Sequence, residues 1–156
     1  MDVDRILPKL LVGSCPRDGA DIERLKTDFG ATAVLSLQTD DDFAAWGIPW
    51  PEIEAACRAA AIALGRAAVP DFDPEALRRK LPECVAALDE LLRAGHAVYV
   101  HCSAGMNRSP SVVIAYLHWV RGMGLEEAVD YVLSRHPCDP YIEAIRLATE
   151  DRTKKR

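Results

Sequence analysis

The sequence has no long uninterrupted apolar segment. A helix needs about 18 consecutive apolar residues to cross a membrane, and no such run occurs, so we expect no membrane partner. The opening residues, MDVDRILPKL, lack the basic start and apolar run of a signal peptide and are too acidic for a transit peptide. We therefore expect a cytoplasmic protein, with a plastid location open if a targeting segment has been removed.

Close cysteine pairs and metal-ligand spacings are also absent. A disulfide framework or a zinc site would require such pairs, so we expect reduced thiols. The histidines do not form a helical His-Glu-x-x-His pattern either. We therefore expect no metal ion and no cofactor. The residues concerned are Cys15, Cys57, Cys84, Cys102, Cys138, His96, His101, His118 and His136.

Positive charge is in deficit. Lys and Arg total 19 against 24 Asp and Glu, which gives a net charge of -5 and a pI near 5.4. Nucleic-acid binding requires a broad basic surface, so we expect no nucleic-acid partner. The closing DRTKKR, residues 151–156, is predicted to be a basic tail in solvent.

Apolar residues make up 49% of the 156 residues, which is enough to form a real core. We predict a single domain over residues 1–150. Extended segments alternate with helical patterns along it. Strands are predicted at 10–13, 32–37, 66–69 and 97–100, and helices at 20–26, 51–65, 74–92, 109–121, 125–135 and 140–150, with QTDDDF (38–43) as a turn. This alternation predicts an α/β fold with a mostly parallel central sheet flanked by helices on both faces.

The segment AVYVHCSAGMNRSPSVVIAYL, residues 97–117, passes from a predicted strand through a short loop into a helix. Ligands of such sheets bind at the carboxyl ends of the strands, where Cys102 falls. Backbone N–H groups wrapped in a turn, followed by a helix N-terminus, favour an anion. We therefore predict an anion site in this loop. Its binding residues are Ser103, Ala104, Gly105, Met106, Asn107 and Arg108.

The side chains of the loop suit a phosphate ester. The guanidinium of Arg108 can hold two phosphate oxygens at once. The positive field favours the thiolate of Cys102, which is the nucleophilic form. Gly105 suits a tight turn, Asn107 tolerates the left-handed region, and Ser109 can donate a hydrogen bond to the sulfur. Singly these residues could be a buried thiol, a surface cation and a helix cap; together they indicate catalysis.

The nonapeptide HCSAGMNRS resembles the His-Cys-x5-Arg-Ser/Thr signature of cysteine-dependent phosphatases of the tyrosine and dual-specificity type. The resemblance implies the dual-specificity phosphatase fold and hydrolysis through a phosphocysteine intermediate. It implies that Cys102 attacks phosphorus and that Arg108 holds the phosphoryl oxygens. His101 and Ser109 complete the catalytic set of the signature.

An alkoxide leaves poorly unless it is protonated, so the reaction requires an acid. Candidates are Asp71 and Asp73 in PDFDP, and Asp41 in TDDDF. In the dual-specificity family the acid lies about thirty residues before the cysteine, and Asp71 lies 31 before it. We predict Asp71, with Asp73 as a helix cap. Asp139 in CDPY is less favoured, because phosphatases with a late Asp-Pro acid carry their cysteine near the amino terminus.

From about residue 10 to 149 the chain is similar to the glucan phosphatases, which comprise plant starch-dephosphorylating enzymes and animal laforin. The similarity lies in LLVGSCPRDGADIERLK, LSLQTDDDFAAWGI, PDFDPEALRRKLP and CDPYIEAIRLAT. The loop departs at Asn107, where that group has glycine. Trp46 and Phe72 fall at the group's glucan-binding aromatic positions, whereas Ala45 and Asp139 depart from them.

The resemblance implies a phosphorylated glucan or another phospho-carbohydrate as substrate. The alternative is a dual-specificity protein phosphatase acting on phosphotyrosine and phosphoserine or phosphothreonine, which would use the same loop with a different rim. Trp46 and Phe72 could equally be core or rim residues, and we expect Trp50 and Trp119 to serve packing. A non-catalytic phosphate-binding module is disfavoured, because such modules typically lose the cysteine, arginine or acid.

Overall fold

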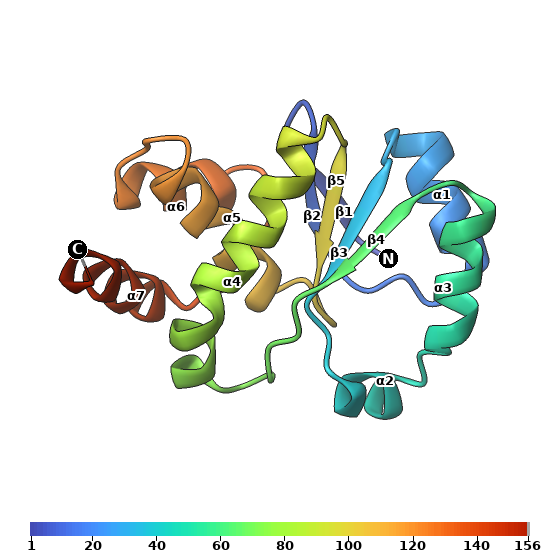
Figure 1. The fold of residues 1–156 in the computed structure, drawn as a ribbon, viewed down its shortest axis with the longest axis horizontal. Helices are drawn as coiled ribbons and strands as arrows, with labels where there is room; N and C mark the ends of the chain where they lie inside the picture. Colours follow the sequence, from blue (N-terminus) through green and yellow to red (C-terminus); the bar gives the residue numbers. More distant parts are fainter. Residues whose placement is uncertain (156) are drawn as a thin grey trace.

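The computed structural model describes residues 1–155. Five strands form one sheet in the order β1-β2-β5-β3-β4 (Figure 1). β2 (Leu10–Gly13), β5 (Val98–His101), β3 (Ala33–Ser36) and β4 (Ala63–Arg66) run parallel. The edge strand β1 (Val3–Leu7) pairs antiparallel with β2. The predicted mostly parallel α/β sheet is therefore confirmed.

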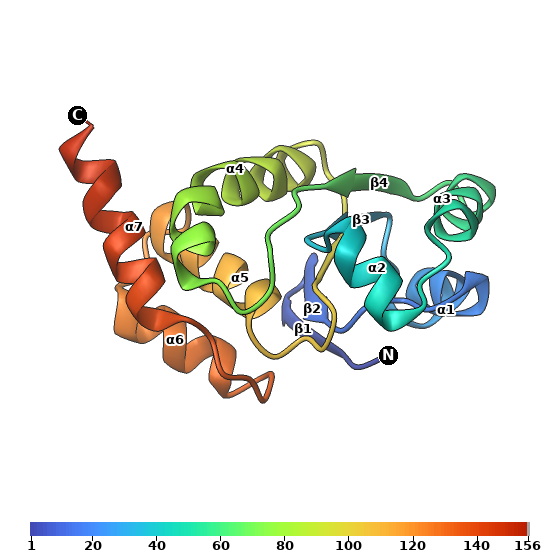
Figure 2. The same ribbon diagram turned by 90° about the horizontal axis from the view of Figure 1, so that it is seen from below.

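Helices cover both faces of the sheet (Figures 1 and 2). One face carries α4 (Pro74–Arg93), α5 (Arg108–Trp119), α6 (Leu125–Leu133) and α7 (Ile142–Lys154). The other carries α1 (Gly19–Phe29) and α3 (Trp50–Ala59), while the short α2 (Asp40–Trp46) follows the end of β3. Strand residues alternate between the two cores, as the two-residue period of a strand requires; Leu10 and Val12 lie in one core and Leu11 in the other.

The connection from β5 to α5 joins the central strand of the sheet to a buried helix. All four residues of β5 are buried, and so are the first ten residues of α5, Arg108 to Leu117. A loop anchored between a central strand and a buried helix has little freedom to move, because both of its ends are close-packed. The fold therefore holds residues 102–107 in a fixed place at the carboxyl edge of the sheet.

Two elements were not predicted. The strand β1 was missed because VDRIL does not alternate: Asp4 and Arg5 interrupt it, and its register with β2 shifts between Arg5 and Leu7. The predicted turn at 38–43 is wrong, because residues 40–46 form α2. Thr39 caps this helix in a capping box with Asp42, and three aspartates occupy the first turn, where the helix dipole favours negative charge.

Three boundaries also differ from the predictions. The third helix ends at Ala59 rather than near Gly65, because Ala61 adopts the left-handed conformation (φ 56°) that usually ends a helix at glycine. The following strand is therefore 63–66 rather than 66–69. At the carboxyl end, residues 151–154 continue α7, and Arg78 of α4 forms an ion pair with Asp151. Residues 151–154 are thus helical, and Thr153, Lys154 and Lys155 are exposed to solvent; residue 156 lies outside the described residues.

Between residues 1 and 155, no helix combines the length and apolar character that crossing a membrane requires.

Candidate active site

The loop from Cys102 to Arg108 is clamped from outside through its carbonyl groups. The N–H of Cys15 donates to the carbonyl of Ser103 at 2.9 Å, and the N–H of Asp139 donates to that of Met106 at 2.7 Å. The ring Nε2 of His136 contacts the Gly105 carbonyl at 2.6 Å.

In a trans peptide the C=O of one residue and the N–H of the next point in opposite directions. Three outward carbonyls therefore turn the N–H groups of Ala104, Met106 and Asn107 toward the inside of the loop. Such convergent N–H groups, at the start of α5, form an anion-binding nest. The loop therefore has the backbone arrangement that the predicted anion site requires.

Two loop residues differ in how they meet this geometry. Gly105 has φ 75°, so the expected need for glycine is confirmed. Asn107 has φ -129° and does not use the left-handed region. Its side chain instead donates to the carbonyl of Asp139 at 2.8 Å, so hydrogen bonds join the loop to residue 139 in both directions.

Cys102 lies at the base of the loop and is 2% exposed. Its Sγ is 3.2 Å from the Oγ of Ser109, and the same Oγ lies 3.1 Å from the carbonyl of Gly13, so the one hydroxyl proton can serve either contact. A hydroxyl at this distance can donate its proton to a thiolate and stabilise it. The predicted contact between Ser109 and the sulfur is therefore present.

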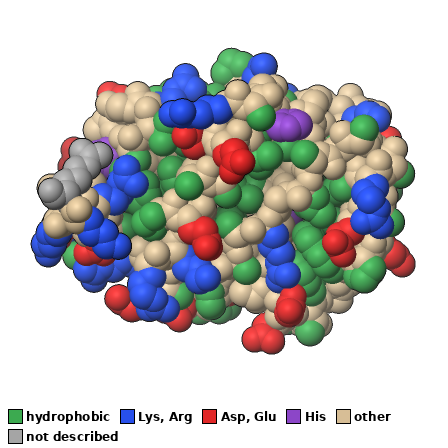
Figure 3. All heavy atoms as spheres, in the orientation of Figure 1, with side chains coloured by type: hydrophobic (Ala, Val, Ile, Leu, Met, Phe, Trp, Pro, Cys, Tyr) green, Lys and Arg blue, Asp and Glu red, His purple; other side chains and the backbone are tan. Residues whose placement is uncertain are grey.

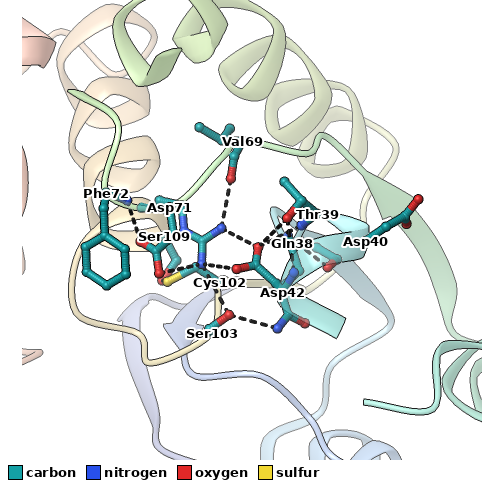
Figure 4. Close-up of polar contacts among 12 residues, drawn as sticks. Gln38, Thr39, Asp40, Asp42, Val69, Asp71, Phe72, Cys102, Ser103 and Ser109 are labelled. Atoms are coloured by element: carbon teal, nitrogen blue, oxygen red, sulfur yellow. Dashed lines mark hydrogen bonds and ion pairs between the residues drawn. The ribbon is translucent and has the colours of Figure 1, made fainter. Parts of the chain in front are cut away.

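Arg108 is 2% exposed, and its acceptors come from three segments. Figure 4 labels these acceptors, which are Asp42, Val69, Asp71 and Ser103. Its Nη1 donates to Asp42 Oδ2 at 2.6 Å and to the carbonyl of Val69 at 2.8 Å. Its Nη2 donates to Ser103 Oγ at 3.2 Å and forms an ion pair with Asp71 Oδ2, also at 3.2 Å. A buried guanidinium requires such partners, so the two aspartates fix its position.

Asp42, which was not among the predicted site residues, is the principal counter-charge of Arg108. Its carboxylate accepts from the N–H and hydroxyl of Thr39 at 2.8 and 3.0 Å, so the capping box of α2 orients it. Burial alone would raise the pKa of Asp42, but the hydrogen bonds from Arg108 and Thr39 hold it below its ordinary value. The Thr-x-x-Asp spacing could have indicated the helix; the pairing of Asp42 with Arg108, 66 residues away, could not be read from sequence.

One donor of Arg108 remains available. Within residues 1–155, its buried Nε–H has no hydrogen-bond partner. A buried unpartnered donor is costly, and here it belongs to the residue that the sequence assigns to phosphate. An oxyanion in the loop could accept from this N–H as well as from the backbone.

The two candidate acids in PDFDP differ clearly. Asp73 caps α4, accepting from the N–H of Ala76 at 2.9 Å, as predicted. Asp71 reaches Arg108 through Oδ2 and accepts from the N–H of Phe72 through Oδ1 at 3.0 Å. Of the two, Asp71 is the one whose carboxyl group lies at the loop. The other candidates, Asp41 and Asp139, have exposed side chains, and no contact joins these side chains to the loop among the described residues.

His101 is buried, and its Nδ1 lies 2.9 Å from the carbonyl of Cys102. Because a carbonyl accepts, Nδ1 carries the proton of this contact. Burial lowers the pKa of His101 to about 4, with the nearby charge of Arg108 adding to the effect. The ring is therefore neutral near pH 7 and is directed at the backbone of Cys102.

The two aromatic residues assigned to substrate lie on different sides of the loop. Phe72 is 86% exposed and follows Asp71, with φ 56°. Trp46 lines a hollow of about 260 Å³ together with Ser103 and Ala104, and the guanidinium of Arg17 lies 5.3 Å from its ring centre. Trp50 stacks on Phe43, and Trp119 donates to Thr149, so the expected packing roles of Trp50 and Trp119 are confirmed.

Three curated relatives align with nearly the whole chain. Phosphoglucan phosphatase LSF1 of Arabidopsis thaliana is 38% identical over 97% of this chain and 25% of its own length. Phosphoglucan phosphatase DSP4 of Castanea sativa is 37% identical over 94% of this chain and 39% of its own length. Laforin of Mus musculus is 32% identical over 99% of this chain and 50% of its own length. The expected similarity to glucan phosphatases is confirmed, and the chain spans a quarter to a half of the length of these relatives.

Solved structures agree with this result. Human DUSP28 has a TM-score of 0.75 and 28% identity, covering 98% of this chain and 99% of that one. PTPMT1 has a TM-score of 0.78 and 22% identity, covering 99% and 100%, and shows a shared fold. Residues 25–145 match the family model of the dual specificity phosphatase catalytic domain. The chain therefore belongs to the dual specificity phosphatases, a family of cysteine-dependent phosphate monoester hydrolases.

Proposed function

We propose that the protein removes phosphate from phosphorylated glucan or a related phospho-carbohydrate, with Cys102 as nucleophile. The thiolate forms a bond to phosphorus while the bond from phosphorus to the sugar oxygen breaks. Arg108 and the inward N–H groups hold the phosphoryl oxygens, which carry the charge of the transition state. Asp71 gives its proton to the departing oxygen.

In the second step water attacks the phosphocysteine, and the carboxylate of Asp71 takes a proton from that water. The bond from sulfur to phosphorus breaks, and the hydroxyl of Ser109 stabilises the departing thiolate. Asp71 faces Arg108 in the described structure, so a bound phosphate would compete with it for the guanidinium. This competition would free Asp71 to act as an acid once substrate is in place.

The exposed aromatic rings are the structural feature that supports a sugar phosphate as substrate. Phe72 lies beside Asp71, and Trp46 lines the hollow beside Ser103, so an apolar ring face is available on two sides of the loop. The C–H face of a sugar can stack on such a ring while its hydroxyl groups bind polar neighbours. The names of LSF1 and DSP4, both phosphoglucan phosphatases, support the same class of substrate. We also propose that residues 1–150 form one catalytic domain and that it works in the cytoplasm or, as the two plant names state for those relatives, in a plastid.

The test is phosphate release from phosphorylated amylopectin, measured beside a panel of phosphotyrosine, phosphoserine and phosphothreonine peptides. We expect turnover of the glucan, and we expect Cys102→Ser to abolish it, because a serine hydroxyl is a poor nucleophile near neutral pH. Trp46→Ala and Phe72→Ala should reduce turnover of the glucan more than turnover of a small aryl phosphate. Turnover of the peptides without turnover of the glucan would assign the alternative, a protein phosphatase.

A further inference from the structure

His136 contacts two hydrogen-bond acceptors at once. Its Nε2 lies 2.6 Å from the carbonyl oxygen of Gly105, and its Nδ1 lies 2.7 Å from the carboxylate oxygen Oδ2 of Asp4. A neutral imidazole has one donor and one acceptor nitrogen, whereas the protonated ring donates from both. Because a carbonyl and a carboxylate both accept, a ring that carries two protons satisfies both contacts, whereas a neutral ring satisfies one of them. The side chain is 5% exposed, so water does not compete freely for either contact.

This ring is one of three groups that bind, from outside, the carbonyls of residues 102–108, which we call the phosphate loop. The other two, on Ser103 and Met106, are backbone N–H groups, whose protons do not titrate. The clamp on Gly105 fixes the peptide unit whose opposite edge is the N–H of Met106. If the ring loses one proton, one ring nitrogen becomes an acceptor that faces another acceptor, either the Asp4 carboxylate or the Gly105 carbonyl. In either case the ring no longer gives the Gly105 carbonyl a charge-assisted hydrogen bond.

We propose that His136, in its doubly protonated form, is a positioning residue that aims the Met106 N–H at the substrate phosphate. The carboxylate of Asp4 accepts the hydrogen bond from Nδ1–H and so stabilises the doubly protonated ring. Oxyanion affinity would then fall as pH rises and His136 becomes neutral. The inference rests on the proposed role of residues 102–108 as the phosphate site. It adds to that role a pH-dependent support that reaches the loop from β1 and from the segment after α6.

The surroundings of the ring contain both signs of charge. Asp4 and Asp2 favour the protonated ring, and Arg24 of α1 opposes it; all three line a surface hollow that also contains His136 and Met106. The effect of Arg24 on the ring is reduced by its other partners, because it donates to the carbonyl of Met1 at 3.1 Å and lies 3.9 Å from Asp28. The loop itself contains the ionisable groups of Cys102 and Arg108, and Asp139 lies on the same segment as His136. Asp4 is the group in direct contact, so it dominates.

The test measures sulfate binding by calorimetry in a Cys102→Ser background. Sulfate keeps its charge, and the serine removes the titration of the thiol. Across about pH 5 to 8, the range in which histidine side chains change charge, sulfate affinity should fall about tenfold, the effect of one charge-assisted hydrogen bond. Nitrogen chemical shifts of the His136 ring, recorded over the same range, should show two protons at low pH and one at high pH, with the midpoint of the affinity change.

Variants separate positioning from a merely structural role. His136→Gln in the same background should bind sulfate at the weaker level throughout and show no pH step, and Asp4→Asn should move the step to lower pH. His118→Gln is the matched control, because His118 also contacts a carbonyl, that of Met123 at 2.7 Å, at the far end of α5; it should keep the full step. An unchanged step in His136→Gln, or full sulfate affinity with a singly protonated His136 ring, would overturn the proposal. Failure of sulfate to bind at any pH would instead contradict the phosphate site itself.

Discussion

At the scale of single residues, Asp71 and Asp73 offer a direct comparison, because they lie two positions apart and have different contacts. Asp71→Asn should lower turnover about 10²- to 10⁴-fold on esters with basic leaving groups such as sugars, and much less on aryl phosphates that leave without a proton. Asp73→Asn should keep most of the activity, because asparagine also caps helices. The measurement is kcat/KM over a series of leaving groups.

A steep leaving-group dependence in Asp73→Asn but not in Asp71→Asn would reverse this assignment. If neither variant shows it, the acid lies elsewhere, and Asp41 and Asp139 are the next residues to replace. Arg108→Lys gives an independent check on the same assay, since a lysine cannot hold two oxygens in the plane of a guanidinium and should lose activity on every member of the series.

Asp42 is the residue whose loss should most affect Arg108. Asp42→Asn leaves a buried guanidinium without its principal counter-charge, and breaking such a pair costs about 3–5 kcal/mol. We expect the free energy of unfolding near pH 7, measured by urea denaturation, to fall by that order. Asp41→Asn is the control, because it removes the same charge from the first turn of α2 at an exposed position.

The sign of the pH effect gives a second test of Asp42. The pKa of this carboxyl is depressed in the folded protein, so its stabilisation is present above the pKa of the unfolded chain and is lost as pH falls through the folded value. The difference in stability between Asp42→Asn and the parent should therefore shrink in acid. Equal stabilities of Asp42→Asn and Asp41→Asn at neutral pH would mean that the ion pair contributes nothing net.

Much of the site could be predicted from local sequence, and the remainder depends on contacts between distant segments. Cys102, Arg108 and Ser109 occupy one loop, so their spacing is visible in the chain. Asp42 and His136 reach that loop from other elements, 66 and 31 residues away in sequence from their partners. No spacing rule links residues so far apart, because the sheet topology and the helix packing bring them together.

At the scale of elements, the phosphate loop packs so closely against the end of β2 that residue 105 has no space for a side chain. A Cβ on Gly105 would lie 2.7 Å from the carbonyl carbon of Gly13 and 2.8 Å from the N atom of Ser14, both backbone atoms. Gly105→Ala should therefore displace the loop, in addition to the strain of a positive φ, which costs about 1–3 kcal/mol. We expect sulfate affinity and kcat/KM to fall at least about tenfold, the effect of losing one charge-assisted hydrogen bond.

Gly122 provides the matched control for that substitution. It has φ 78°, close to the value at Gly105, but a Cβ at this position would have no neighbouring atom within 4 Å. Gly122→Ala should therefore carry the backbone strain alone, lowering stability while leaving sulfate affinity unchanged. Equal losses of sulfate affinity in the two variants would show that strain, rather than the contact with β2, controls the loop.

Helices and strands whose apolar residues recur at a regular spacing were predicted, and those whose limits depend on tertiary contacts were not. The helix from Pro74 shows its cap and its apolar stripe in sequence, so its extent was predicted within a residue. β1 gains its conformation from pairing with β2, and α3 ends at an alanine where the sequence offered a glycine further on. Pairing with a neighbouring strand determines the first boundary, and the left-handed conformation of Ala61 determines the second.

At the scale of the whole molecule, the sheet and its two helical layers follow from the alternation of strands and helices, but the charge distribution does not follow from the net charge. Arg78, Arg79, Arg152, Lys154 and Lys155 line a hollow at α4 and the end of α7, and Figure 3 shows basic side chains gathered in that region. The net charge of -5 therefore does not exclude a local cluster of basic side chains at this hollow. At the same hollow, Arg78 and Asp151 tie α7 to α4 through two hydrogen bonds of 2.7 and 2.9 Å.

The stability of the molecule should also depend on pH through His101, which lies at the end of the central strand. Its pKa falls from 6.5 to about 4 in the folded protein because of burial. Between these values the unfolded chain binds a proton that the folded chain does not, so the free energy of unfolding should rise with pH across this window. A shift of this size corresponds to about 3 kcal/mol.

Urea denaturation from about pH 4 to 7 measures this change in the free energy of unfolding. His101→Asn should flatten this part of the curve, whereas His118→Gln should not. Should His101→Asn fail to fold, proton NMR of the parent decides: a His101 ring that becomes protonated near pH 6 without unfolding would contradict the prediction.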